Sequence, residues 1–259
     1  MSLKRWKITV EYDGTGYSGW QTQDNVPTIQ GELEKALKAF CQQNIRIHGA
    51  GRTDAGVHAW GQVAHFDLDH KLEDLTGFEL AKAMNAHLRP QPITVIDARI
   101  VDEEFHARFG AKHKTYHYHI LSRPHPPTLD ALRLWYVKKK LDLNSIQDAA
   151  QALTGHHDFT SFRDSACQAK SPIRTLDHIE ITKDPYDDFG GELFTFSFEA
   201  QSFLHHQVRN IVGTLKLVGE GKWEVCEVEK ALLAKDRSAA GPTAPAHGLF
   251  LKHIDYSIE

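Results

Sequence analysis

The sequence predicts an α+β fold built from two halves that each follow a ferredoxin-like order of elements. Segments in which apolar residues alternate with polar ones, as in strands, are interspersed with segments of helical apolar periodicity. The first half gives the order βαββαβ, and the second half gives a similar order. A chain of 259 residues is long enough for two domains. We expect halves at residues 1–108 and 109–259, with two sheets that merge side by side around a central cleft.

The first half opens on a strand, because four apolar residues alternate with polar ones: Trp6, Ile8, Val10 and Tyr12. Thr28 then begins a helix whose apolar positions fall on one face: Ile29, Leu33, Ala36, Leu37 and Phe40. The apolar runs around Ile45 and Val63 predict two further strands.

A second helix and a fourth strand complete the first half. Thr76 and Glu79 form the pattern of a capping box, which marks a helix start. Pro90 follows the last apolar position of that helix, Leu88, and a strand is expected at residues 93–101. The predicted order is therefore βαββαβ.

The second half repeats this order without residue-level similarity to the first. A strand is predicted at residues 113–121 and a helix from about Asn144 to Leu153. Two strands, a helix that follows Ser202, another helix and a last strand come next, around residues 176–181, 194–198, 204–218, 228–234 and 249–256. Proline-rich stretches at 122–127 and 239–246 predict loops.

The segment 49–58, GAGRTDAGVH, is the strongest indication of function. Three glycines and two alanines leave little side-chain bulk around Asp54, so a ligand can approach the backbone closely. The connection between the flanking strands is longer than a hairpin needs, and excess loop is usually functional or disordered. Arg52 stands two residues away, and pairing with it would lower the Asp54 pKa. A plain turn capped by Asp54 is the alternative interpretation.

The charge balance by itself does not indicate a nucleic-acid partner, since 30 basic and 34 acidic residues give a net charge of −4. The distribution is more informative. Residues 105–129 contain no acidic residue, and five histidines and two tyrosines alternate there with four basic residues: Arg108, Lys112, Lys114 and Arg123. Such a strip neutralises phosphates and offers rings for stacking. An edge strand protected by charge is the alternative interpretation.

Cysteine usage and the chain start predict a cytoplasmic protein. Cys41, Cys167 and Cys226 are widely spaced and odd in number, which fits a reducing compartment rather than a disulfide framework. The start lacks the apolar core of a signal peptide, and no run approaches the roughly 20 apolar residues of a membrane span.

Several motifs occur in an order that resembles one family. They are EYDG at 11–14, YSGWQ at 17–21, GRTDAGVHA at 51–59, GQVAHF at 61–66, FHARF at 105–109, KTYHY at 114–118, DFTSFR at 158–163 and FLHHQVRNIVG at 203–213. Together they resemble the tRNA pseudouridine synthases of the A type, and the match spans nearly the whole chain.

The resemblance implies the pseudouridine synthase fold and the isomerisation of uridine to pseudouridine in the anticodon arm of tRNA, at positions 38 to 40. It implies no cofactor, no metal and no membrane, and a homodimer that binds one tRNA across both subunits. Asp54 would be the catalytic residue. Arg52 would help to extrude the target nucleotide, Tyr116 would lie against the flipped uracil, and Arg209 would pair with Asp54.

Several alternatives stay open at the level of sequence. A carboxylate suits attack on C1′ of the sugar, attack on the uracil ring, or removal of a sugar proton. A non-catalytic RNA-binding module would leave Asp54 without a purpose. A glycoside or nucleoside hydrolase usually needs a second carboxyl group, and no Asp or Glu lies within ten residues of Asp54. His205 and His206 are expected about 100° apart on a helix, which disfavours a zinc site.

Overall fold

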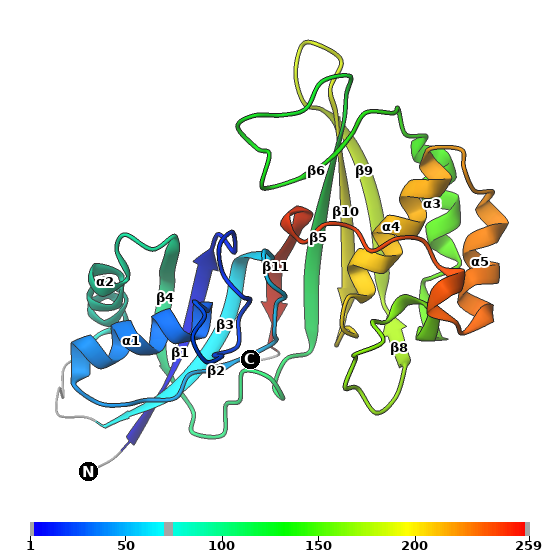
Figure 1. Ribbon diagram of the computed structural model, residues 1–259. Helices are drawn as coiled ribbons and strands as arrows, with labels where there is room; N and C mark the ends of the chain where they lie inside the picture. Colours follow the sequence, from blue (N-terminus) through cyan, green and yellow to red (C-terminus); the bar gives the residue numbers. More distant parts are fainter. Residues whose placement is uncertain (1–2, 70–74, 257–259) are drawn as a thin grey trace. The chain divides into compact units, whose positions relative to one another are not determined.

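The computed structural model describes residues 3–69 and 75–256 of the chain (Figure 1). The chain divides into two compact units, one formed by residues 1–112 and 251–259 and the other by residues 113–250. The first division falls four residues beyond the expected boundary at 108, and the end of the chain returns to unit 1. The structure confirms the α+β class.

Unit 1 contains an antiparallel sheet in which β1 (Leu3–Tyr12) lies between β3 (His58–Asp69) and β4 (Ile93–Val101). A two-residue strand, β2 (His48–Gly49), pairs with β3. With helices α1 (Ile29–Cys41) and α2 (Gly77–Leu88), the order along the chain is βαββαβ, as the sequence predicts. β11 (Leu249–Asp255) is the last strand of the chain.

Local signals set the ends of both helices in unit 1. The Thr28 hydroxyl accepts a hydrogen bond from the Gly31 amide at the start of α1. The capping box of Thr76 and Glu79 forms at α2 as expected. Apolar residues of β1 and α1 are fully buried in the core of this unit, among them Trp6, Ile8, Leu33 and Leu37.

The strand predicted around Ile45 is displaced and short, because only His48–Gly49 pairs with β3. Helix α1 satisfies the backbone of this segment with side chains. The Gln30 amide donates to the Ile47 carbonyl at 2.9 Å, and the Glu34 carboxylate accepts from the Ile47 amide at 3.0 Å. With its polar backbone groups paired in this way, Ile47 needs no neighbouring strand although it is buried.

Unit 2 contains a sheet in which β10 lies between β5 and β9, all antiparallel. The strands are β5 (His113–Ser122), β9 (His178–Pro185) and β10 (Glu192–Ala200). Three short strands were not predicted from the sequence. They are β6 (Trp135–Val137), which runs parallel to β5, and β7 (Gly155–Asp158) and β8 (Ile173–Leu176), which pair with each other. Pairs this short carry no periodicity that a sequence pattern reveals.

Three helices lie on one side of the unit 2 sheet in Figure 1: α3 (Leu143–Gln151), α4 (Gln207–Gly219) and α5 (Val225–Ala234). Alternate residues of β10 fill the core beneath them and are fully buried: Phe194, Phe196 and Phe198. Two 3-10 turns, Arg237–Ala239 and Ala246–Gly248, lie at the two ends of the loop expected at residues 239–246. Among the described residues, no helix is long and apolar enough to cross a bilayer.

Candidate active site

Asp54 lies in the loop formed by residues 50–57, between β2 and β3, and is half-buried. β3 begins inside the expected loop, at His58, so the connection is shorter than predicted. The start of the loop backbone is tied to β3 by two hydrogen bonds. The Ala50 amide donates to the Val63 carbonyl at 2.8 Å, and the buried Gln62 amide donates to the Gly51 carbonyl at 2.9 Å. The strand therefore fixes the approach to Asp54.

The residue before Asp54 is held by the N-terminal motif. The hydroxyl groups of Thr53 and Tyr12 lie 2.8 Å apart, and the Trp20 amide donates to the Thr53 carbonyl at 3.1 Å. Gly19 packs so closely that a Cβ there would lie 2.5 Å from the Thr53 carbonyl oxygen. Burial raises the pKa of Tyr12 to about 12, so its hydroxyl keeps its proton at neutral pH.

The far side of the loop meets the same motif. A Cβ on Gly14 would lie 2.0 Å from the Val57 carbonyl oxygen, so only glycine permits this approach. The Gly14 amide donates to Nδ1 of His58 at 3.0 Å, and that nitrogen also lies 3.1 Å from the Asp13 carboxylate. The EYDG and YSGWQ segments thus form the support of the Asp54 loop, a role that their glycines indicate but that the sequence analysis left unassigned.

The expected pairing of Arg52 with Asp54 is wrong, although both side chains belong to this loop. Arg52 is exposed and forms no ion pair within residues 3–69 and 75–256. Two residues apart on an irregular loop, the two side chains need not point the same way. Arg52 is thereby left accessible to a ligand.

Tyr116 and Arg209 belong to unit 2. Tyr116 is on β5, is 8% exposed, and packs edge-on against Phe203 with ring centroids 5.1 Å apart. Its neighbour on the same strand face, Tyr118, is fully buried and donates to the Pro245 carbonyl at 2.8 Å. Burial raises the pKa of Tyr118. Tyr118 is thus a core residue, and Tyr116 is only slightly more exposed.

Arg209 lies in the first turn of α4 and is partly exposed. Its Nε donates to the Ala244 carbonyl at 2.8 Å, and the Ala244 amide donates back to the Arg209 carbonyl at 3.1 Å. The apolar residues around it, Val208, Ile211 and Val212, are all buried, so this part of the helix is packed. The stem of Arg209 is therefore fixed between α4 and the 240–245 loop.

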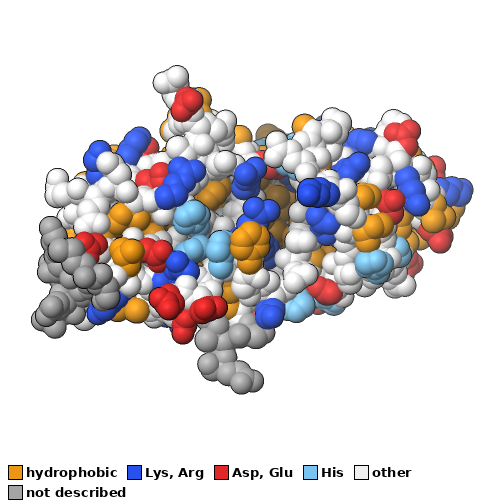
Figure 2. All heavy atoms as spheres, turned by 90° about the horizontal axis from the view of Figure 1, so that it is seen from below, with side chains coloured by type: hydrophobic (Ala, Val, Ile, Leu, Met, Phe, Trp, Pro, Cys, Tyr) orange, Lys and Arg blue, Asp and Glu red, His pale blue; other side chains and the backbone are white. Residues whose placement is uncertain are grey.

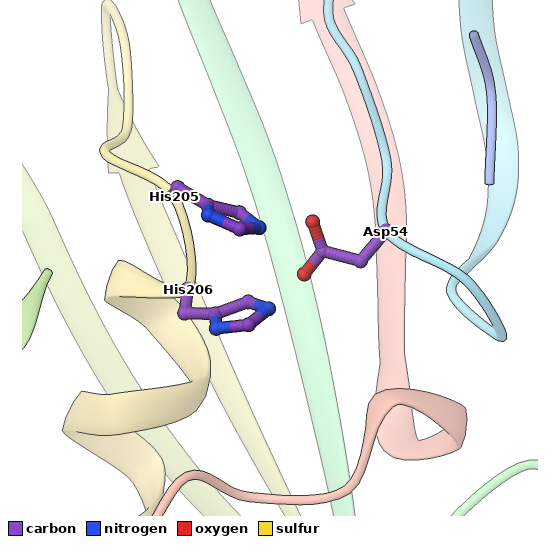
Figure 3. A group of neighbouring side chains, drawn as sticks. All are labelled: Asp54, His205 and His206. Carbon is purple, nitrogen blue, oxygen red and sulfur yellow. The ribbon is translucent and has the colours of Figure 1, made fainter. Parts of the chain in front are cut away.

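His205 and His206 are not on a helix, which corrects the expectation of side chains 100° apart. They precede α4, which begins at Gln207, and their ring centroids lie only 3.9 Å apart (Figure 3). His206 has a left-handed backbone with φ 60°, and its Nδ1 lies 2.7 Å from the Asp164 carboxylate. The hydrogen bond that the Ala166 backbone amide donates to the Asp164 carboxylate holds the pKa of that carboxyl below its ordinary value, and the hydrogen bond with His206 lowers it further.

The basic strip 105–129 is only partly available to a ligand. Arg123 forms an ion pair with Asp187 at 2.6 Å and stacks over Tyr186. Arg108 and Lys112 are exposed. Figure 2 shows Lys and Arg side chains together with acidic ones on the face that it draws. Within the strip, Arg108 and Lys112 are therefore the cations left exposed to a ligand.

The comparisons with known proteins agree with these motifs. The sequence model of the family described as tRNA pseudouridine synthase matches residues 8–110 and 149–257. The tRNA pseudouridine synthase A of Rhodospirillum rubrum is 53% identical over 254 residues, covering 98% of this chain and 88% of that protein. Those of Paramagnetospirillum magneticum and Parvibaculum lavamentivorans are 50% and 49% identical, each over 98% of this chain and over 96% and 100% of their own lengths. The similarity runs through both units.

Proposed function

Because this chain belongs to the tRNA pseudouridine synthase family, we propose that it isomerises uridine to pseudouridine in the anticodon arm of tRNA, with Asp54 as the catalytic carboxylate. The observation that carries the proposal is the support of the Asp54 loop. Hydrogen bonds and two close glycine contacts fix the backbone on both sides of Asp54. Catalytic groups need such fixed placement, since a shift of about 1 Å can cost about 100-fold in rate.

The reaction needs only acid-base and nucleophilic chemistry. The bond between N1 of uracil and C1′ breaks, C5 bonds to C1′, the proton on C5 leaves, and N1 gains a proton. In this reaction Asp54 would attack C1′ of the sugar, attack the uracil ring, or remove a sugar proton. The atoms balance without an oxidant, and we propose neither a cofactor nor a metal for it.

The supporting residues have separate roles in this proposal. A uridine in a stem must leave the base stack before its C5 is accessible. Arg52, exposed on the same loop as Asp54, would hold the extruded backbone. Tyr116 would place its ring against uracil, and its hydroxyl would relay the C5 proton. Arg209, held at Ala244, would pair with Asp54 and keep it ionised, so unit 2 would complete the active-site cleft.

The test is release of tritium from tRNA labelled at C5 of uridine, because the new bond displaces that hydrogen. Wild-type protein is expected to release tritium under single-turnover conditions. Asp54→Asn is expected to lose release by at least about 1,000-fold while tRNA binding persists. Asp24→Asn, an exposed carboxylate in the same unit, is the matched control and keeps wild-type release. Tight tRNA binding without release by the wild type would instead indicate an RNA-binding protein.

We also propose that the protein acts in the cytoplasm as a homodimer. The net charge of −4 is unfavourable for binding a polyanion, and a second copy would add its own basic strip to one tRNA. Sedimentation velocity with and without tRNA tests the stoichiometry. Native electrophoresis at rising salt tests the electrostatic part, and binding that is indifferent to salt would contradict it.

A further inference from the structure

Phe109 is an exposed aromatic ring that the fold holds in place. Its side chain is 76% exposed, yet its ring centroid lies 4.4 Å from that of His106. Nδ1 of His106 accepts hydrogen bonds from the Arg108 amide at 3.1 Å and from the Phe109 amide at 3.3 Å. The Gly110 amide donates to the His106 carbonyl at 2.8 Å. This short turn therefore fixes the backbone at Phe109, and its ring rests against that of His106 while most of the side chain faces solvent.

The His106 ring contacts the buried ring of His65, which in turn contacts His48. We call these three rings, His48, His65 and His106, the imidazole stack. The centroids of His106 and His65 lie 4.6 Å apart, and those of His65 and His48 lie 5.2 Å apart in a stacked arrangement. His65 is 4% exposed, and its Nδ1 accepts from the Ala107 amide at 3.2 Å. The outer ring is thus anchored through His106 to a buried residue of β3.

Other exposed phenylalanines lack this support. Phe78 on α2 and Phe189 in the loop before β10 are 78% and 88% exposed. Neither ring makes an aromatic or cation contact within the described part of the chain. A single exposed apolar side chain is ordinary, but one that rests against another ring has already lost part of the rotamer entropy that binding costs. Phe109 is therefore prepared to bind a flat ligand in a way that Phe78 is not.

The charges around Phe109 favour a nucleobase over a phosphate. The guanidinium carbon of Arg108 lies 5.6 Å from the centre of the Phe109 ring, and Lys112 is exposed nearby in sequence. Glu103 and Glu104 are also exposed and precede the turn, so the cations have no excess over the carboxylates. A phosphate cluster would need that excess, whereas stacking on a ring beside a guanidinium does not.

We propose that Phe109, backed by the imidazole stack, is a stacking site for one unpaired base of the bound tRNA. The inference rests on the proposed function, because it takes tRNA as the ligand. Stacking on an aromatic side chain is sequence-tolerant and contributes about 1–3 kcal/mol for each base, which corresponds to roughly 5- to 150-fold in Kd. The site adds affinity and orientation without touching the reacting atoms.

The test compares Phe109→Ala with Phe78→Ala, which removes an equally exposed ring from the same unit. Phe109→Ala is expected to raise the Kd for tRNA about 10-fold and to leave its salt dependence unchanged, and Phe109→Tyr is expected to restore binding. Phe78→Ala is expected to bind like the wild type. Anticodon stem-loops with 2-aminopurine at single loop positions should lose fluorescence on binding, and the loss at one position should disappear in Phe109→Ala.

The outcomes separate this inference from the proposed function. Equal Kd values for wild type, Phe109→Ala and Phe78→Ala would overturn the stacking site. A change in sedimentation of the free protein, with unchanged tRNA affinity, would assign Phe109 to a contact between copies of the chain and also overturn it. If Phe109→Ala weakens tRNA binding but the wild type never releases tritium, the stacking site stands and the proposed reaction fails.

Discussion

The hydroxyl groups of Tyr12 and Thr53 are 2.8 Å apart inside unit 1, which links the end of β1 to the residue before Asp54. The two side chains are 3% and 7% exposed. Removing one hydroxyl of a buried hydrogen bond is costly, because the hydroxyl that remains has no hydrogen-bond partner and no access to water. Through this contact the first strand helps to set the position of the proposed catalytic carboxylate.

Tyr12→Phe is expected to lower the free energy of unfolding by about 1–2 kcal/mol, since the Thr53 hydroxyl loses its buried partner. It should also lower kcat about 10-fold, because the Asp54 loop loses one of its fixed points. Urea denaturation and tritium release measure the two effects. Tyr17→Phe removes a hydroxyl that bonds to Gln91, away from the loop, and should leave kcat unchanged. Equal loss of kcat in both variants would contradict the role given to Tyr12.

Gly19→Ala and Gly16→Ala form a second matched pair. Both glycines have positive φ, +87° and +84°, so alanine strains the backbone by about 1–2 kcal/mol at either position. Only at Gly19 does the new Cβ meet the loop, 2.5 Å from the Thr53 carbonyl oxygen, whereas Gly16 has open space. Gly19→Ala is therefore expected to lose about 100-fold in kcat, and Gly16→Ala is expected to lose stability alone. Similar kcat values for the two variants would show that the close approach is dispensable.

Asn210→Ala is expected to destabilise unit 2 by about 3 kcal/mol. The buried Asn210 amide donates to the Phe162 carbonyl at 2.9 Å, and its oxygen accepts from Thr243 at 2.7 Å and Arg237 at 3.1 Å. Alanine leaves these groups without their partner. The midpoint of urea unfolding measures the loss, and Asn144→Ala, at an exposed position of α3, should change stability by less than about 0.5 kcal/mol. Equal midpoints for the two variants would contradict the network.

Unit 1 should lose stability as the pH falls from about 6.5 to about 4. Burial, together with nearby His106, His48 and Arg5, lowers the pKa of His65 to about 4. Between the ordinary value of about 6.5 and 4, the unfolded chain binds a proton that folded His65 does not, so acid favours unfolding. One pKa unit corresponds to about 1.4 kcal/mol, so the two units between pH 6.5 and 4.5 correspond to at most about 3 kcal/mol. Urea unfolding at pH 7 and 4.5 measures this loss of unfolding free energy. His65→Phe should lose less stability between the two pH values than the wild type, and an equal loss would exclude His65 as its cause.

Some elements followed from the sequence because their signals are local. The capping box at Thr76 and the cap at Thr28 each involve residues within one turn, and both form as predicted. The fourth strand has the predicted bounds, Ile93–Val101, because its alternation is continuous. The glycine-rich surroundings of Asp54 also follow from the sequence. Its catalytic role remains a proposal, as do those of Arg52, Tyr116 and Arg209.

Other features depended on partners far apart in the sequence, and only the tertiary structure decided them. Side chains of α1 form the backbone hydrogen bonds of Ile47 that a neighbouring strand would otherwise form. Arg123 of the basic strip forms an ion pair with Asp187. The segment before α4 turned at His206, beside Asp164, and brought the His205 and His206 rings together. The physical reason is the same in each case. A polar group forms its hydrogen bond with whichever partner the folded chain places within reach. The spacing of residues along the sequence does not show which residues tens of positions away will be that partner.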